Sequence, residues 1–349
     1  MKIIHRGQAA FAVVGLAATL CSPAFSAEVT DATTVPLPAT IATKAVSALT
    51  LDITEAGSAI VAVGGRGHVL ISNDNGDSWE QQNVPVRTTL IAVDFADAKN
   101  GWAVGHDSVI IHTKDGGESW KVENFEPLTD GTAALYGVLA VDANRAFAVG
   151  SFGKMRQTTD SGSSWSAVDT SVTDTGAHIN DMIKLPSGTL VAVGESGFIA
   201  TSTDKGGTWS LTKPAYAGSY FGAVPMGNNG IRVFGLQGNA FETPDVAKLA
   251  TMDPDDFDPW DIPELDDAEL MSVGWKRIVT PTNTTIYGGY ASDNGDVVMV
   301  GSSATIYTLK NGTLATVDSR YNLPIAGVVA RDGRIIIAAV DGVHVVKTK

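Results

Sequence analysis

The nine residues STDKGGTWS, from Ser202 to Ser210, occur in nearly the same form at three other places in the chain. The related stretches are SNDNGDSWE from Ser72, TKDGGESWK from Thr113 and TTDSGSSWS from Thr158. All four follow the pattern Ser/Thr-x-Asp-x-Gly-x-Ser/Thr-Trp. A pattern repeated in this way is either a chemical site used several times or a structural element of a repetitive fold.

The motif belongs to a longer repeat. Each copy follows an apolar run closed by Ala-Val-Gly, and the glycines that end these runs, Gly64, Gly105, Gly150 and Gly194, are 41, 45 and 44 residues apart. Short apolar or alternating runs bounded by Gly, Asp and Asn, repeated at this period, are typical of β-propeller blades. Three further units without the motif follow: IRVFGLQGNAFETPD, DVVMVGSSATIYTLKNGTLATVD and RIIIAAVDGVHVVKTK. We therefore predict an all-β fold, a seven-bladed β-propeller of four-stranded antiparallel blades.

The last unit stops after its third strand. A closed ring leaves no free sheet edge, and strands from both termini commonly complete one blade. We therefore expect residues 38–46 to supply the missing outer strand, within a lead-in segment at 27–47 that precedes the propeller at 48–349.

The repeated motif itself is predicted to be structural. An Asp carboxylate at the start of a tight turn accepts backbone N–H bonds, a Gly supplies positive φ, and a Trp fills the space between units. Copies on different blades of a ring would also be too far apart to form one catalytic centre. The structural residues are Asp74, Gly76, Trp79, Asp115, Gly117, Trp120, Asp160, Gly162, Trp165, Asp204, Gly206 and Trp209.

The N-terminus has the features of a secretory signal peptide. Lys2 and Arg6 precede the apolar run AAFAVVGLAATL, and small residues then allow cleavage near Ser26 or Ala27. Acylation at Cys21 is the alternative, although Leu20 stands where a small residue is expected. We expect a periplasmic or secreted monomer with residues 1–26 removed, no stable membrane span and no disulfide. A formal net charge of −14 argues against a nucleic-acid partner.

The four motifs resemble the Asp box of bacterial-neuraminidase-type (BNR) repeats. Through GWAVG at 101–105, the turns DGGESW and DKGGTW and its overall length, the chain resembles the photosystem II stability and assembly factor family. That resemblance implies an exported, non-enzymatic propeller without a cofactor that serves as an assembly or accessory scaffold. Its relatives dock partner proteins through an arginine-rich patch. We expect a protein partner in a membrane-associated or envelope complex, with an envelope transporter as the preferred class.

Motifs for catalysis and metal binding are missing from the sequence. There is no Arg-Ile-Pro segment of the sialidase type before the first Asp box, no marked pair of carboxylates, no metal-ligand spacing of His or Cys and no phosphate-binding loop. A glycan-binding or glycan-cleaving protein of sialidase type remains the alternative. Its sugar platform would use the aromatic residues Tyr216, Tyr220, Phe221, Tyr287 and Tyr290.

Partner binding is expected on the face opposite the Asp boxes, where the turns between second and third strands surround the channel. Loops on a rigid scaffold commonly carry binding functions. The turns and the neighbouring connections carry a mixed, partly basic set of side chains, and solvated loop charges are the alternative interpretation. The candidate rim consists of Arg66, His68, Arg87, His106, Phe152, Lys154, Arg156, Glu195 and Arg320.

An acidic insertion at 242–273 interrupts the fifth unit, where the spacing from Gly235 to Gly301 reaches 66 residues. Eleven acidic residues lie between Glu242 and Glu269. A solvated acidic loop is the first interpretation, and a partner-binding arm anchored by Phe257 and Trp260 is the second. A calcium site is the third, although the Gly and the final Glu of an EF-hand loop are absent. Its ligands would be Asp253, Asp255, Asp256, Asp258 and Asp261.

Overall fold

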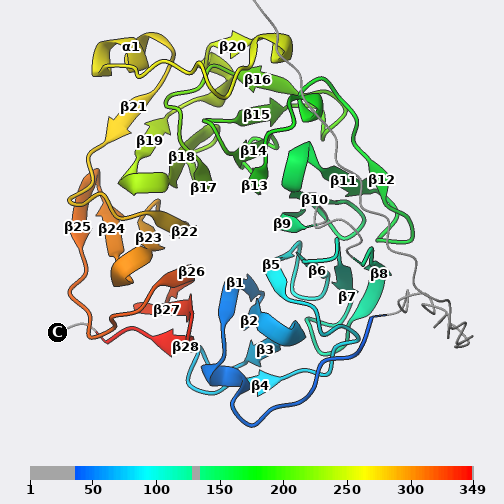
Figure 1. Cartoon of the computed structure of the whole chain (residues 1–349). Helices are drawn as coiled ribbons and strands as arrows, with labels where there is room; N and C mark the ends of the chain where they lie inside the picture. The colour runs from blue at the N-terminus through cyan, green and yellow to red at the C-terminus, as the bar shows by residue number, and fades with distance from the viewer. Residues whose placement is uncertain (1–35, 128–133, 348–349) are drawn as a thin grey trace, which may run out of the picture. The chain divides into compact units, whose positions relative to one another are not determined.

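The computed structural model describes residues 36–127 and 134–347, whose strands form seven antiparallel sheets around a central channel (Figure 1). The predicted all-β, seven-bladed propeller is confirmed. The strands of each blade are given from the channel outward. Blade 1 consists of β1 (Thr50–Ala56), β2 (Ala59–Gly64), β3 (Val69–Ser72) and β4 (Glu80–Gln81), and blade 2 of β5 (Leu90–Phe95), β6 (Gly101–Gly105), β7 (Ile110–Thr113) and β8 (Lys121–Asn124). Blade 3 consists of β9 (Leu135–Ala140), β10 (Ala146–Gly150), β11 (Met155–Thr158) and β12 (Ser166–Ala167), and blade 4 of β13 (Ile179–Lys184), β14 (Leu190–Gly194), β15 (Ile199–Ser202) and β16 (Ser210–Thr212). Blade 5 consists of β17 (Tyr220–Met226), β18 (Gly230–Gly235), β19 (Ala240–Thr243) and β21 (Lys276–Ile278). Blade 6 consists of β22 (Ile286–Ala291), β23 (Val297–Gly301), β24 (Ile306–Lys310) and β25 (Thr313–Thr316). Blade 7 consists of β26 (Ile325–Arg331), β27 (Arg334–Ala339) and β28 (Gly342–Val345).

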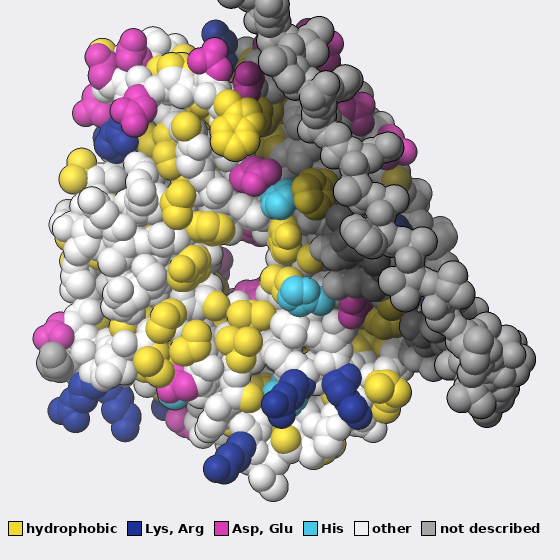
Figure 2. Space-filling view, viewed as in Figure 1, with side chains coloured by type: hydrophobic (Ala, Val, Ile, Leu, Met, Phe, Trp, Pro, Cys, Tyr) yellow, Lys and Arg dark blue, Asp and Glu magenta, His cyan; other side chains and the backbone are white. Residues whose placement is uncertain are grey.

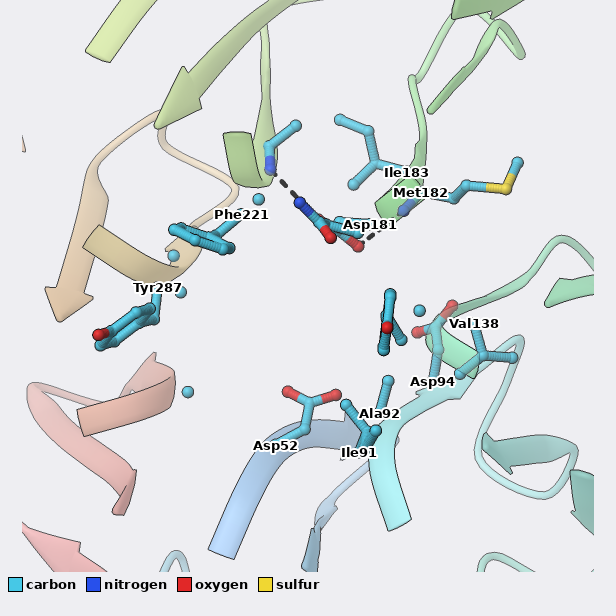
Figure 3. A pocket seen from close by; sticks show the side chains of 18 of the residues that line it. Asp52, Ile91, Ala92, Asp94, Val138, Asp181, Met182, Ile183, Phe221 and Tyr287 are labelled. Atoms are coloured by element: carbon cyan, nitrogen blue, oxygen red, sulfur yellow. Dashed lines mark hydrogen bonds between the residues drawn. The ribbon is translucent and has the colours of Figure 1, made fainter. Parts of the chain in front are cut away.

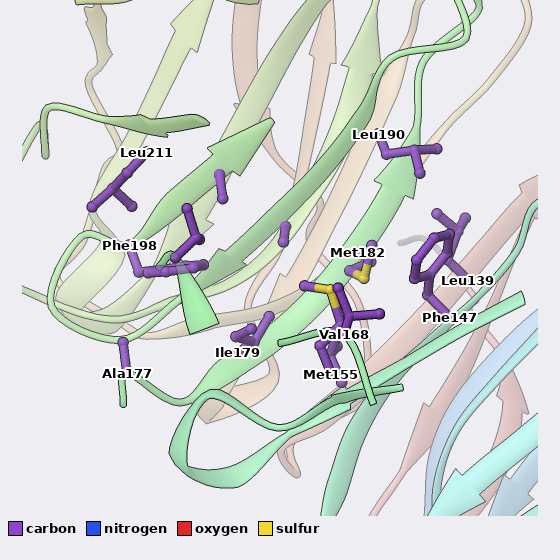
Figure 4. Close-up of a cluster of buried hydrophobic side chains, with 14 of the residues drawn as sticks. Leu139, Phe147, Met155, Val168, Ala177, Ile179, Met182, Leu190, Phe198 and Leu211 are labelled. Carbon is purple, nitrogen blue, oxygen red and sulfur yellow. The ribbon is translucent and has the colours of Figure 1, made fainter. Parts of the chain in front are cut away.

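The core consists of layers of side chains between neighbouring blades. The second strand of a blade is apolar throughout because both of its faces are covered, and every residue of β6 and β10 is buried. Figure 4 shows one such layer between blades 3 and 4. Its members include Leu139, Phe147 and Met155 of blade 3 and Ile179, Met182 and Leu190 of blade 4. Burying these faces supplies the main stabilising term of the ring, about 25 cal/mol per Å² of apolar surface.

Each copy of the repeated motif forms the turn between the third and fourth strands of its blade. In the first copy, Asp74 Oδ1 accepts hydrogen bonds from Ser72 Oγ (2.9 Å) and the backbone N–H of Ser78 (2.8 Å). Ser72 Oγ in turn accepts one from the N–H of Gly76 (2.8 Å). The same three bonds recur at Asp115, Asp160 and Asp204. The four carboxylates therefore close turns on four different blades.

The structure corrects the predicted ring closure. Blade 7 has three strands, and residues 38–46 form no strand among the described residues. Pro36 and Pro38 have no N–H to donate, and in this segment Ala39 N–H donates to Val84 O (3.0 Å) of blade 1. The short 3₁₀ turn η1 (Ala45–Ser47) then contacts β28. Side-chain packing between blades 1 and 7, and not a shared strand, closes the ring.

The insertion lies between β19 and β21 and contains η6 (Val246–Lys248), β20 (Thr251–Met252), η7 (Pro254–Asp256) and α1 (Asp267–Ser272). β20 pairs with β16, so the insertion of blade 5 adds a fifth strand to blade 4 (Figure 1). Asp266 caps α1 by accepting bonds from the N–H groups of Ala268 and Glu269, and Leu270 is buried. Part of the insertion is therefore built into the propeller.

The predicted signal peptide at 1–26 and the first part of the lead-in segment lie outside the described residues. Within residues 36–127 and 134–347, no helix is long and apolar enough to cross a membrane.

Candidate functional site

The central channel encloses a cavity of about 880 Å³ and is lined by the inner strands of all seven blades. Each inner strand contains a β-bulge near its start, where the register with the second strand shifts by one residue. A bulge leaves one residue without a ladder partner and redirects its side chain. The seven bulged residues all line the cavity, and we call them the bulge ring: Leu51, Ile91, Tyr136, Asn180, Phe221, Tyr287 and Ala326.

The bulge ring is mostly apolar and holds three aromatic side chains. Phe221 and Tyr287, on adjacent blades, pack edge to face with ring centroids 5.6 Å apart (Figure 3). Tyr136 lies 6.0 Å from the ring of His178, and Asn180 Nδ2 donates to Tyr220 O (2.7 Å). Clefts that combine apolar surface with a few fixed polar groups are typical binding sites.

Three carboxyl groups, those of Asp52, Asp94 and Asp181, also line the channel, on β1, β5 and β13 (Figure 3). Each carboxylate accepts a hydrogen bond from a backbone N–H group of the next blade. Asp52 Oδ2 accepts from Val93 N–H (2.8 Å). Asp94 Oδ2 accepts from Ala140 N–H (2.8 Å), and Asp181 Oδ2 accepts from the N–H of Ala223 (3.2 Å). The three aspartates therefore link successive inner strands.

The channel environment raises the pKa of these carboxyl groups. Burial raises the pKa of Asp52 and Asp94 to about 7 and that of Asp181 to about 6, against the effect of the backbone hydrogen bonds, which lower it. Repulsion from Asp181 adds to the shift at Asp52 and Asp94. The side chains are half-buried, and the part left exposed faces the channel. Desolvation thus favours the neutral form.

Exposed hydrophobic side chains surround the mouth of the channel at the end where the second strands finish. Five of them, each 37–44% exposed, lie on blades 5, 6 and 7 and just before blade 1, and we call them the mouth crescent: Leu49, Leu236, Tyr287, Leu323 and Val340. Figure 2 shows hydrophobic side chains gathered around the central opening. Exposed apolar groups that cluster in this way mark interaction surfaces more often than scattered ones do.

Five of the nine predicted rim residues are exposed: Arg66, Arg87, His106, Phe152 and Arg320. Arg66 and Arg87 are neighbours, because Gly67 of the Arg66 turn packs directly against the backbone of Val86 and Arg87. Arg87 Nε donates to Pro38 O (3.2 Å). Phe152, at 61% exposed, packs edge to face on His178 with centroids 4.7 Å apart.

Of the other four rim residues, His68 is buried, and Lys154, Arg156 and Glu195 are half-buried and bonded to neighbouring residues. His68 is 6% exposed, so its predicted place on the surface is wrong; burial, and then Arg66, lower its pKa. Lys154 Nζ donates to Ser108 Oγ (2.9 Å) and Arg156 pairs with Glu126, which ties blade 3 to blade 2. Glu195 Oε1 accepts from the N–H of His178 (2.8 Å) and orients that residue at the mouth.

The five aromatic residues of the glycan alternative do not form one platform. Tyr220 is fully buried, and Tyr216 donates its hydroxyl hydrogen to Ser219 O. Tyr290 of blade 6 donates to Glu55 Oε2 (3.1 Å) of blade 1, although blade 7 separates these two blades in the ring. Only Phe221 and Tyr287 of the set line the channel.

The two predicted anchors of the insertion differ in their surroundings. Phe257 packs edge to face on Phe198 of blade 4, with centroids 6.3 Å apart, and joins the core layer there. Trp260 is 94% exposed. Among the described residues, no group of three His, Cys, Asp or Glu side chains is placed to hold a metal ion, and this includes the aspartates of the insertion.

Of the bulge ring, only Phe221 and Tyr287 were candidate site residues in the sequence, as part of the sugar platform, and the channel aspartates were not candidates. One signal was present: TLDIT, AVDFA and INDMI each place an acid directly beside apolar residues of an inner strand. An acid in such a position indicates either a surface strand or a carboxyl group that accepts specific hydrogen bonds. A bulge, in contrast, has no reliable signature in a single sequence.

Comparisons with known proteins agree on one family. The family model described as "Photosynthesis system II assembly factor YCF48" matches residues 77–223, from the first Asp box to the inner strand of blade 5. The chloroplast photosystem II stability/assembly factor HCF136 of Cyanidioschyzon merolae is 31% identical over 84 residues, which are 24% of this chain and 18% of that protein. The photosystem II assembly lipoprotein Ycf48 of Prochlorococcus marinus is 35% identical over 60 residues, 17% and 18% of the two chains. The resemblance to this assembly-factor family is confirmed, although each match spans less than a fifth of the relative.

Solved structures show the same fold over nearly the whole chain. A structure of YCF48 bound to D1 peptide superposes with a TM-score of 0.62 at 18% identity, covering 92% of this chain and 99% of that one. The WD40 propeller domain of Doa1 gives a TM-score of 0.60 at 14% identity, covering 90% and 97%. At these identities the likeness concerns the fold alone.

Proposed function

We propose that this protein is a non-enzymatic scaffold of the cell envelope that binds an extended segment of a membrane-associated partner at the mouth of its channel. The mouth crescent is the single observation that carries the proposal. Its five apolar side chains are exposed at the end of the ring where the second strands finish, and one of them, Tyr287, also lines the cavity of about 880 Å³. Assembly factors among the relatives, and the peptide-bound YCF48 structure, support a protein partner.

The surroundings of the crescent suggest the chemistry of the partner segment. The chain carries a net charge of −14, yet Arg66 and Arg87 lie side by side on this face without a carboxylate partner among the described residues. An extended segment with apolar side chains for the crescent and an acidic residue for the arginines fits this surface, because charge complementarity guides association. A periplasmic location and an envelope transporter as the partner rest on the signal-peptide features and on the resemblance.

Substitution of three crescent residues is expected to weaken partner capture strongly. The variant Leu236→Ser/Tyr287→Ser/Val340→Ser loses three partly exposed apolar contacts, and truncating such anchors commonly weakens binding about tenfold or more. Crosslinked pull-down from envelope membranes, with quantification of the captured protein, measures the effect. A melting curve close to that of the wild type is expected as well, because the three side chains are already in contact with water.

The matched control is Ile41→Ser, which removes an apolar side chain that is 59% exposed beside the outer strand of blade 1, where Ala42 N–H donates to Gln81 Oε1 (2.8 Å). A second arm, Arg66→Ala/Arg87→Ala, is expected to weaken capture most at low salt. Unchanged capture by the crescent variant, or an equal loss in the Ile41 control, would contradict the proposed docking site. Glycan binding on an array with no protein captured would favour the sialidase-type alternative.

The insertion provides a proposed second contact with the partner. We expect Trp260→Ala to reduce capture severalfold while leaving the melting temperature unchanged, because the side chain is 94% exposed. Phe257→Ala is the matched comparison and is expected to lower the melting temperature, since Phe257 packs on Phe198. Capture by Trp260→Ala at the wild-type level would contradict the second contact and would leave the insertion only its structural role, the strand that it adds to blade 4.

A further inference from the structure

Each Asp-box turn packs on the blade that precedes it in the ring. The contact between blades 2 and 3 differs in composition from the other three contacts of this kind. The Asp-box glycine of each turn faces the neighbouring blade. Gly76 faces the apolar side chains of Ile336 and Val345, Gly117 faces Ile71, and Gly206 faces Phe147. Gly162 instead lies against the carboxylate of Glu123. A polar group therefore replaces an apolar contact at one of the four seams.

Glu123 is the centre of a buried polar network. Its Oε1 lies 2.7 Å from Nδ1 of His112, and its Oε2 accepts from the indole N–H groups of Trp102 (3.1 Å) and Trp165 (2.9 Å). The side chains of His112 and Glu123 are only 2% and 4% exposed. Trp102 stacks on His112 with the ring centroids 4.1 Å apart and the planes 8° apart. The carboxylate is thus supplied with three donors and holds the imidazole in one orientation.

One atom of this network has no hydrogen-bond partner. Because Nδ1 donates to Glu123, the other ring nitrogen, Nε2 of His112, is left buried and unpaired among the described residues. Buried polar atoms are paired in the great majority of cases, and an exception indicates an occupant such as water, an ion or a ligand. A cavity of about 300 Å³ lies beside this ring, and His112, Lys114, Lys121 and Glu123 are among the residues that line it.

The lining shows which occupant is suited to the cavity. Its serine hydroxyls are already used: Ser119 donates to Asp115, Ser161 to Asn144 and Ser163 to the backbone of Asp160. Lys114 and Lys121 are exposed, and neither ammonium group forms an ion pair with a described residue. The donors still available at the pocket are the two ammonium groups, and the ring atom without a partner is His112 Nε2, which accepts a hydrogen bond when Nδ1 carries the proton.

We propose that this pocket between blades 2 and 3 binds a small anionic group, a carboxylate or a phosphate, that is neutralised by Lys114 and Lys121 and is joined to His112 by a water molecule that donates one hydrogen bond to Nε2 and one to the anion. Both groups are planar or tetrahedral oxyanions that accept several charge-assisted hydrogen bonds. The pocket lies beside the Asp-box turns of Trp120 and Ser163, whereas the mouth crescent lies at the end where the second strands finish. The two sites are therefore separate, and this proposal does not depend on the docking function.

Nuclear magnetic resonance of the folded protein tests the proposal. The His112 ring and the indole N–H of Trp165 are followed while inorganic phosphate or sodium acetate is added at constant ionic strength. We expect a saturable shift of both signals with one of the two anions or with both, and the anion that binds more tightly identifies the group. The absence of a saturable shift with either anion would overturn the proposal.

Three variants distinguish a built site from general attraction of anions. Lys114→Gln/Lys121→Gln leaves the buried network intact and is expected to weaken binding at least tenfold. His112→Gln keeps a donor for Glu123 but loses Nε2, with the same expectation. The matched control, Lys205→Gln, removes an exposed lysine from the Asp-box turn of blade 4 and is expected to bind as the wild type does. An affinity unchanged in the double lysine variant, or equally weakened in the Lys205 control, would also overturn the proposal.

Discussion

Trp120→Ala is expected to lower the free energy of unfolding by about 3–5 kcal/mol, the range for truncating a buried aromatic side chain. Trp120 is 8% exposed and belongs to the core layer shared by blades 1 and 2. Its ring packs edge to face on Phe95 with centroids 6.2 Å apart, and its Nε1–H donates to Gly117 O (2.8 Å). The substitution therefore opens a cavity and removes a bond that holds the turn. Urea unfolding followed by circular dichroism measures the loss.

Trp209→Ala provides the matched comparison within the same motif. Trp209 packs edge to face on Phe147 in blade 3, but it is half-buried and its Nε1–H has no partner among the described residues. A clearly smaller loss is expected, because less apolar surface returns to water and no hydrogen bond is broken. Equal losses for the two variants, or no loss for Trp120→Ala, would contradict the structural role assigned to the motif.

The stability of the protein is expected to fall as the pH rises from about 5 to 8, by about 1–3 kcal/mol in total after screening by channel water. The pKa of Asp52 and Asp94 is about 7 in the folded state and that of Asp181 about 6, all above the ordinary value near 4. Between these values the folded protein binds protons that the unfolded chain does not bind. Their stabilising contribution is complete below pH 4 and is lost as the pH rises through 6 to 7.

The Asp-box carboxylates have the opposite effect on stability: they stabilise the folded state at higher pH and lose this effect in acid. Hydrogen bonds from Ser78 lower the pKa of Asp74 to about 2, and bonds from Thr208 do the same for Asp204. Their contribution is present above pH 4 and is lost as the pH falls towards 2. We therefore expect maximal stability between about pH 4 and 6, which urea unfolding at a series of pH values measures.

A triple variant tests whether the channel aspartates cause the loss of stability between pH 5 and 8. Asp52→Asn/Asp94→Asn/Asp181→Asn removes the three titrating groups and is expected to give a flatter profile between pH 5 and 8. Its absolute stability is expected to be lower, since an amide places its NH₂ group near backbone donors such as Val93 N–H. A wild-type stability that rises from pH 5 to 8, or a profile that the variant leaves unchanged, would contradict the assignment.

Much of the fold was predictable because its information is local. Within nine residues, each Asp box contains its hydroxyl, carboxylate, glycine and tryptophan, and three hydrogen bonds inside that stretch form the turn. The run before it, such as GWAVG at 101–105, is apolar at every position because both faces of the second strand are covered. Counting these units gave the number of blades.

The ring closure and the rim were predicted less well because they depend on contacts between distant segments. Residues 38–46 contain strand-forming residues, but they begin with Pro38, and a backbone bond from Ala39 to Val84 holds them against blade 1. Lys154 and Arg156 look like free turn charges in the sequence, whereas the adjacent blade supplies Ser108 and Glu126 as their partners. A charge in a loop cannot be assigned as free until its neighbour in the ring is known.

Local sequence patterns are enough to identify a seven-bladed propeller with structural Asp boxes and an acidic insertion, because turns and strands are encoded in consecutive residues. The places where a ligand has room depend on contacts between distant segments. Seven bulges bring Leu51, Tyr136, Phe221, Tyr287 and their counterparts into one ring. Likewise, two blades enclose the His112–Glu123 pair. These groups are separated by tens to hundreds of residues in the chain, and only closure of the ring places them side by side.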